Sequence, residues 1–172
     1  MENISFVFDN DGIPNSVYEE NGKQYRVRVE TLILNKKNEV LINYTNKLNQ
    51  YGRYYKIPGG SIEPGLTLEQ CAQKECNEEV RIVVDDIRYC CKIKTLYKKI
   101  PEWHKTILWP IGLKYNGSVT FVFLARYKKK YKGFIGEKDF EPDMLNNAKF
   151  YNIKTVMPLL CKEHQRILLN VL

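Results

Sequence analysis

Three glutamates, Glu75, Glu78 and Glu79, lie within five consecutive positions behind a glycine-rich segment. In a helix, at about 100° per residue, their side chains fall on the same side as the apolar residues of that segment. Two carboxylates about 5 Å apart repel by roughly 3 kcal/mol at an effective dielectric constant of about 20. Lys74 precedes Glu78 by one helical turn and supplies one charge at most. A divalent cation that prefers oxygen ligands, Mg²⁺ or Mn²⁺, would balance the carboxylates and also bind phosphate oxygens.

The elements around these glutamates predict how they are positioned. Glycines and prolines punctuate residues 58–65, and Thr67 and Gln70 match a capping box, so we expect a loop and then a helix from about Leu68. Strand-like patterns cover residues 25–34, 40–44, 81–97, 106–113 and 119–130. A helical apolar stripe in residues 156–172 contains Leu160, His164, Ile167 and Val171. Strands with helices on both sides predict an α/β fold, an α/β/α sandwich.

Length and composition limit the class of protein. The 172 residues, 44% of them hydrophobic, predict one compact domain over residues 25–172. Residues 1–24 are rich in turn formers and predict an N-terminal arm or hairpin, which could join a second copy in a homodimer. Five cysteines without a CxxC pair indicate neither a disulfide framework nor a zinc site. With no apolar run of membrane-spanning length and no signal-peptide pattern, we expect a cytoplasmic protein without membrane contact.

The net charge of +7 is concentrated in one part of the chain. Residues 88–132 contain twelve Lys or Arg against a single acid, Glu102, together with several tyrosines and both tryptophans. Cations mixed with stacking surfaces suit ligands that carry phosphates and bases. The plainer interpretation, solvated lysines on ordinary strands, stays open at this point.

The segment at residues 59–82 resembles the Nudix box; its sequence is GGSIEPGLTLEQCAQKECNEEVRI. The box consists of Gly, five residues, Glu, seven residues, Arg-Glu, an apolar residue, any residue, Glu-Glu, any residue, Gly and an apolar residue. Gly60 takes the first glycine, and Glu75, Glu78 and Glu79 fall in register with the family's glutamates. The preceding KIPGG is also family-like, and a looser likeness extends over most of residues 25–160. The resemblance implies a Nudix-like α/β/α sandwich with a mixed β-sheet.

Three positions depart from the family's pattern. Leu66 stands where the family has its first glutamate, which would weaken cation binding. Lys74 replaces an arginine, and a flexible ammonium cannot reproduce the bidentate geometry of a guanidinium. Arg81 replaces a glycine at the helix exit, where a left-handed conformation costs a non-glycine residue about 1 kcal/mol, so we expect a differently built helix end. All three box glutamates remain, which favours an active enzyme.

The activity that the resemblance implies is hydrolysis of a nucleoside diphosphate linked to another moiety. Glu75, Glu78 and Glu79, helped by a backbone carbonyl near Gly59, would hold Mg²⁺ or Mn²⁺. The general base would be a box glutamate or an acid of a later loop, residues 136–144, in which we prefer Glu141.

The substrate stays open, because Tyr97 and Pro101 both lie where the family carries markers for different substrates. We prefer a small nucleotide: ADP-ribose, a nucleotide sugar, a dinucleoside polyphosphate or a nucleoside triphosphate. The alternatives are an RNA 5′-end or cap pyrophosphohydrolase, and a catalytically weak module that senses a nucleotide. Neither histidine is needed for these functions: we expect His164 to be a packed core or rim residue and His104 to be exposed in a turn.

Overall fold

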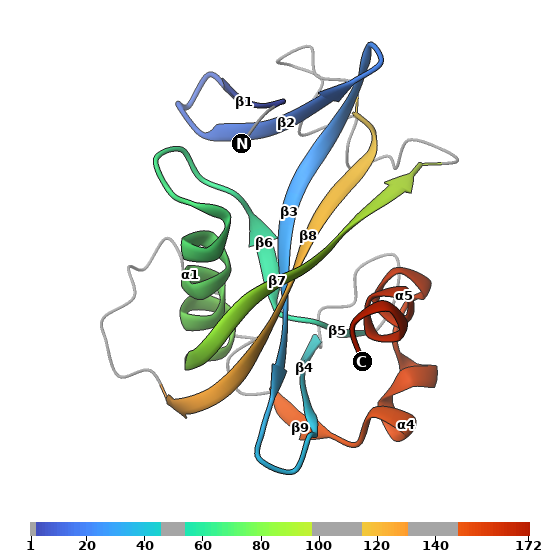
Figure 1. Cartoon of the computed structure of the whole chain (residues 1–172). Helices are drawn as coiled ribbons and strands as arrows, with labels where there is room; N and C mark the ends of the chain where they lie inside the picture. Colours follow the sequence, from blue (N-terminus) through green and yellow to red (C-terminus); the bar gives the residue numbers. More distant parts are fainter. Residues whose placement is uncertain (1–2, 46–53, 98–114, 131–147) are drawn as a thin grey trace.

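The computed structural model describes residues 3–45, 54–97, 115–130 and 148–172 (Figure 1). Nine strands in this part form one mixed sheet. Their bounds are β1 Ile4–Phe8, β2 Pro14–Glu20, β3 Lys23–Leu34, β4 Val40–Thr45, β5 Tyr54–Lys56, β6 Gly59–Ser61, β7 Ile82–Leu96, β8 Tyr115–Lys130 and β9 Lys149–Tyr151. The helices are α1 Leu68–Val80, α4 Ile153–Val156 and α5 Lys162–Val171, with a 3₁₀ turn, η3, at Met157–Leu159.

Strand β3 is the centre of the sheet because four other strands pair with it. It runs parallel to β8 and antiparallel to β2, β4 and β6, and β7 continues the sheet antiparallel to β8. The run at residues 119–125 is apolar on both faces, and its Val119, Val122 and Ala125 are buried in β8. The strand-like pattern at residues 119–130 is therefore confirmed as a strand that is covered on both sides.

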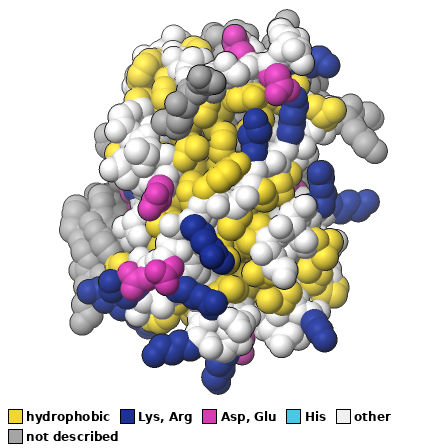
Figure 2. Space-filling model, viewed as in Figure 1, with side chains coloured by type: hydrophobic (Ala, Val, Ile, Leu, Met, Phe, Trp, Pro, Cys, Tyr) yellow, Lys and Arg dark blue, Asp and Glu magenta, His cyan; other side chains and the backbone are white. Residues whose placement is uncertain are grey.

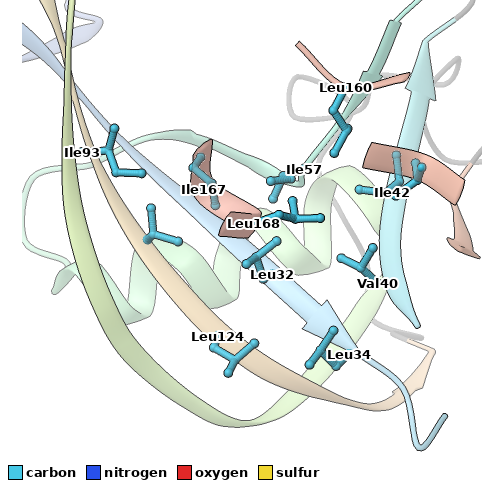
Figure 3. Close-up of a cluster of buried hydrophobic side chains, with 12 residues drawn as sticks. Leu32, Leu34, Val40, Ile42, Ile57, Ile93, Leu124, Leu160, Ile167 and Leu168 are labelled. Atoms are coloured by element: carbon cyan, nitrogen blue, oxygen red, sulfur yellow. The ribbon is translucent and has the colours of Figure 1, made fainter. Parts of the chain in front are cut away.

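Helix α1 covers one face of the sheet, and α4 and α5 cover the other (Figure 1). Alternate residues of β3 face the two layers. The α1 side of the core contains Tyr25, Val27 and Val29 of β3 with Cys71 and Ala72 of α1. The opposite side contains Leu32 and Leu34 of β3 with Ile167 and Leu168 of α5, as Figure 3 shows. This arrangement is the predicted α/β/α sandwich with a mixed sheet.

Residues 1–24 include the two strands of an antiparallel hairpin, β1 and β2. Its second strand also pairs with β3, and its Val17 and Tyr18 are buried. Lys92 and Lys94 of β7 lie over the rings of Tyr18 and Tyr25, with Nζ 5.0 and 4.2 Å from the ring centroids, so cation–π contacts join β7 to this end of the sheet. The domain boundary at residue 24 and a homodimer through the hairpin stay predictions.

The C-terminal segment departs in detail from the expected single helix. Its helical stripe divides into α4, η3 and α5, and Leu160 lies between helices, in a β-bridge with Tyr55. Pro158 interrupts the helix because it has no N–H to donate. The strand expected at residues 106–113 lies outside the described residues. All five cysteines are free, and no helix in the described ranges is long and apolar enough to cross a membrane.

Candidate active site

Helix α1 begins where the capping box predicts. The Thr67 hydroxyl accepts a hydrogen bond from the Gln70 N–H at 3.1 Å, and the Gln70 side chain accepts one from the Thr67 N–H at 2.8 Å. The helix follows β6, whose two glycines allow close approaches. A Cβ on Gly60 would lie 2.1 Å from Oε1 of Glu75, and a Cβ on Gly59 would lie 2.2 Å from the Val29 carbonyl oxygen. These glycines therefore let Glu75 lie directly against β6 while β6 pairs with β3.

Glu79 is held by two groups from the KIPGG segment. The Gly59 N–H donates to Oε2 at 2.9 Å, and the Lys56 ammonium donates to Oε1 at 2.6 Å. The Lys56 and Glu79 side chains are only 11% and 15% exposed, so water screens their attraction weakly. Sequence reasoning missed Lys56, because nothing in its local pattern shows that β5 places it opposite the last turn of α1.

Glu78 contacts Lys74 at 3.0 Å, and Lys74 also contacts Glu63 at 2.6 Å. Partial burial disfavours the ammonium, but hydrogen bonds to Glu63 and Glu78 outweigh it and raise the pKa of Lys74. The residue that replaces the family's arginine thus still reaches a box glutamate. Glu63, in the loop before α1, is the second partner of this lysine.

Glu75 is the box glutamate with the most perturbed ionisation. Burial raises the pKa of its carboxyl to about 8, helped by the negative charges of Glu79 and Glu78 and opposed by Arg28 and Lys56. The donor atoms of the three box glutamates are all oxygens, which fits Mg²⁺ or Mn²⁺. Among the described residues, however, no three acidic, His or Cys side chains converge on one point, because lysines hold two of the glutamates.

A second set of buried charges lies next to the box, and sequence reasoning missed it as a set. Glu30 of β3 is 2% exposed, and its Oε2 lies 3.3 Å from Nε2 of His164, which is 8% exposed. Burial disfavours the imidazolium, but the charge of Glu30 outweighs it and raises the pKa of His164 to about 10. Burial likewise opposes ionisation of Glu30, while His164, Arg28 and Lys56 lower its pKa. His164 is buried as expected, but it carries an unexpected partner.

The same face of β3 carries two arginines. The Arg26 guanidinium donates to the Ser61 hydroxyl at 3.0 Å. Nε of Arg28 is buried without a hydrogen-bond partner in the described structure, although the charges of Glu30, Glu79 and Glu163 outweigh burial and raise the pKa of this residue. The sequence did contain a signal for this layer. In YRVRVE the charged residues alternate with valines, so they lie on one face of a strand that is covered on both sides.

Glu163, at the start of α5, is a further member of this polar layer, which also contains Arg26, Arg28 and Glu30 of β3. Its Oε1 lies within 3.2 to 3.5 Å of three hydroxyl groups, those of Thr95, Ser118 and Thr120. The polar layer thus extends across β3, β8 and β7, between the box glutamates and α5.

The other positions noted in the sequence have mixed outcomes. The preferred base, Glu141, lies outside the described residues, as do His104 and Pro101. Leu66 packs against the apolar cluster under α1. Arg81 has φ 53° and ψ 46°, so α1 ends in the left-handed conformation that the family's glycine would adopt. Our expectation of a differently built helix end is therefore wrong, because Arg81 adopts this conformation despite its strain.

The end of β8 bears on the basic stretch. Lys128 pairs with Asp85 of β7 at 2.9 Å, and both side chains are about half exposed, at 49% and 48%. Lys129 and Lys130 are also exposed. In the described part of residues 88–132, the lysines that end β8 therefore lie in solvent, which agrees with the plainer interpretation of the basic stretch.

Comparison with known proteins identifies the family. The model of the NUDIX domain matches residues 24–169, so the chain belongs to the Nudix family and is a Nudix hydrolase. An 8-oxo-dGTP diphosphatase of Proteus vulgaris is 27% identical over 89 residues, which are 52% of this chain and 77% of that protein. Both results agree with the box read from the sequence.

Solved structures share the fold at low sequence identity. A NUDIX hydrolase from Nitrosomonas europaea has a TM-score of 0.61 at 12% identity, over 85% of this chain and 87% of that one. The NUDIX domain of Shewanella oneidensis NrtR, solved with ADP ribose, has a TM-score of 0.59 at 15% identity, over 95% of this chain and 90% of that one. At these identities the likeness extends to the fold alone.

Proposed function

We propose that this protein hydrolyses the diphosphate linkage of a small nucleotide, with Mg²⁺ or Mn²⁺ held by Glu75, Glu78, Glu79 and the carbonyl of Gly59. The observation that carries the proposal is the position of three carboxylates on one side of α1, where burial, helped by the charges of Glu79 and Glu78, raises the pKa of Glu75 to about 8. Such a group is stabilised by a divalent cation more than by any further side chain of the site. When bound, the cation supplies Lewis acidity, which neutralises phosphate charge and makes water a better nucleophile.

The protein's own residues position the reactants. The Gly59 N–H and Lys56 fix the carboxylate of Glu79 before substrate arrives. Arg28 has a buried Nε without a hydrogen-bond partner in the described structure and lies in the same polar layer, so we assign it to a phosphate oxygen of the substrate. Glu141 stays our preferred general base, and a box glutamate is the second candidate. Five free thiols fit a reducing cytoplasm as the site of the reaction.

The test is a Mg²⁺-dependent hydrolysis screen over ADP-ribose, nucleotide sugars, dinucleoside polyphosphates and nucleoside triphosphates, including oxidised ones. Glu79→Gln should lower turnover at least about 100-fold, since even residues that only support a metal ligand cost up to that factor. Glu69→Gln is the matched control, because Glu69 is an exposed glutamate of the same helix. Full activity of Glu79→Gln would disprove the mechanism.

Nucleotide sensing without cleavage is the second candidate. Two of the three box glutamates are already paired with lysines, and a structural neighbour, the NUDIX domain of NrtR, was solved with ADP ribose. If this candidate is correct, calorimetry will detect tight binding of a nucleotide that the protein does not hydrolyse in Mg²⁺ at any pH between 6 and 9.

RNA 5′-end processing is less favoured. On the face drawn in Figure 2, the described Lys and Arg side chains are scattered among hydrophobic ones rather than gathered in one patch. We therefore expect binding of a 5′-triphosphorylated RNA to fall only slightly from about 50 to 200 mM salt, because each neutralised phosphate adds roughly one logarithmic unit per tenfold salt. A hundredfold loss, matched by changing Lys128, Lys129 and Lys130 to Gln, would instead favour RNA.

A further inference from the structure

Lys56 and Lys74 each neutralise one box glutamate, but they differ in burial. Lys74 is 35% exposed and divides its contacts between Glu63 and Glu78, so its ammonium can move into water. Lys56, the last residue of β5, is 11% exposed and contacts Glu79 at 2.6 Å. A buried ammonium cannot leave its carboxylate for water at low cost, so it needs another anion nearby.

Glu30 is that anion. Glu30 is 2% exposed, and its side chain lies beside Gly59, because a Cβ on Gly59 would lie 2.8 Å from Cγ of Glu30. The Gly59 N–H donates to Glu79 at 2.9 Å, so Glu30 and the Lys56–Glu79 pair lie on either side of one residue. Lys56 is also among the cations that lower the pKa of Glu30. The contact of Glu30 with His164 is an ion pair at 3.3 Å without the alignment of a hydrogen bond, since Oε2 has no hydrogen-bond partner in the described structure. This oxygen can therefore still accept a hydrogen bond from a donor such as an ammonium group.

We propose that Lys56 is an exchangeable counter-cation of the metal site. It occupies Glu79 when no divalent cation is bound, and it pairs with Glu30 when the cation takes Glu79. Lys56 thereby lowers the affinity of the site for a divalent metal, and Glu30 determines how readily Lys56 leaves Glu79. The inference rests on the proposed function only in taking Glu79 as a metal ligand.

The exchange follows from charge balance. The polar layer contains the cations Arg28, Lys56 and His164 and the carboxylates Glu30, Glu79 and Glu163. Adding a divalent cation at Glu79 while an ammonium stays at 2.6 Å would place like charges in contact, at a site that water reaches poorly. Movement of one side chain toward Glu30 separates those charges without exposing either to water.

The test is Mn²⁺ binding to the full chain without nucleotide, measured from the EPR signal of free Mn²⁺ at fixed pH and salt. Lys56→Met should bind Mn²⁺ about tenfold more tightly, because it removes the competing cation. Lys56→Arg should bind it more weakly than the wild type, because a guanidinium holds a carboxylate with two hydrogen bonds and gives way less easily. Unchanged or weaker binding by a folded Lys56→Met protein would overturn the proposal, as would tighter binding by Lys56→Arg.

Two controls separate exchange from a general effect of charge. Lys74→Met removes a more exposed ammonium and should change the Mn²⁺ affinity about threefold at most, since water screens it. Lys129→Met removes an exposed lysine on β8 and should change nothing. If either control tightens binding as much as Lys56→Met, the effect is one of net charge and the proposal is wrong.

A double-mutant cycle tests the role of Glu30. Glu30→Gln should weaken Mn²⁺ binding in the wild type, because Lys56 then has no second partner, and should weaken it at least fivefold less in the Lys56→Met background. Equal effects in the two backgrounds would show that Glu30 acts only as a fixed charge, and would overturn its assigned role. Lys56→Met alone still tests the exchange if Glu30→Gln fails to fold.

These measurements are independent of turnover. If the nucleotide screen detects no hydrolysis while Lys56→Met still tightens Mn²⁺ binding, the proposed reaction fails and the counter-cation stands. If hydrolysis requires Glu79 but Lys56 leaves the Mn²⁺ affinity unchanged, the reaction stands and the counter-cation fails.

Discussion

Two halves of one sheet face differ sharply in chemistry, although the same strands form both. Toward the start of β3, Arg26, Arg28 and Glu30 face the α5 side, next to Ser118 and Thr120 of β8. Two residues further along each strand, the same side becomes Leu32, Leu34, Val122 and Leu124, packed under α5 (Figure 3). Alternation along a strand fixes only which side a residue faces. We therefore expect the apolar half to supply stability and the polar half to supply charged groups for chemistry.

Leu32→Ala should give the largest effect, because it breaks the apolar half. Leu32 is fully buried at 0% exposed, and its truncation should cost about 3 kcal/mol of unfolding free energy through lost burial and a cavity. Urea unfolding monitored by circular dichroism measures the loss. Mn²⁺ affinity per folded molecule should stay unchanged. A loss below about 1 kcal/mol would show that this half does not carry the stability we assign to it.

Two single substitutions on β8 test where the polar half of the sheet face ends and the apolar half begins. Val122→Thr buries a hydroxyl in the apolar half and should destabilise by about 2 kcal/mol. Thr120→Val, one step away on the same side, loses a long 3.4 Å contact to Glu163 that two other hydroxyls also make, and should cost about 1 kcal/mol or less. The two variants have nearly equal volume, so urea unfolding compares polarity alone. The reverse order of the two losses would contradict the boundary.

The pH dependence of His164 tests the polar half. The pKa of His164 rises from 6.5 in the unfolded chain to about 10 in the folded protein, so its ion pair with Glu30 contributes fully below pH 6.5 and is lost as the pH rises through 10. The difference in unfolding free energy between the wild type and His164→Gln should therefore shrink between pH 6.5 and 10. His104 is present in both proteins and cancels. A difference that is constant over this range would refute the ion pair.

Arg81→Gly should give the smallest effect, a gain of about 0.5 to 1 kcal/mol, because glycine adopts the left-handed helix end without strain. Arg81→Ala keeps the strain and loses the side chain, so it is the matched control and should not stabilise. Thermal unfolding of the metal-free protein measures both. The gain in stability would also make Arg81→Gly a useful background in which to compare the stability losses of Leu32→Ala and Val122→Thr. Stabilisation by Arg81→Ala would show that backbone strain is not the cause of the gain.

Local rules made much of the fold and part of the site predictable. The capping box fixed the start of α1, hydrophobic periodicity gave β3, β7 and β8, and helical spacing placed Glu75, Glu78 and Glu79 on one side. These rules succeed because the interacting groups lie within a few residues of one another. The general base and the strand at residues 106–113 stay predictions, because Glu141 and that segment lie outside the described residues.

Local sequence patterns account for which side chains carry charge, for the start of α1 and for the side that its glutamates face. The partners of these side chains follow from the packing of distant elements. Lys56, at the end of β5, contacts Glu79, in the last turn of α1. Glu30 contacts His164 because α5, from the far end of the chain, packs on the sheet opposite α1 (Figure 1). No local pattern specifies such pairs, because packing of whole elements sets the distance between them. The attraction between two such charges depends on their distance and on how much water surrounds them, and both are set only when the chain has folded.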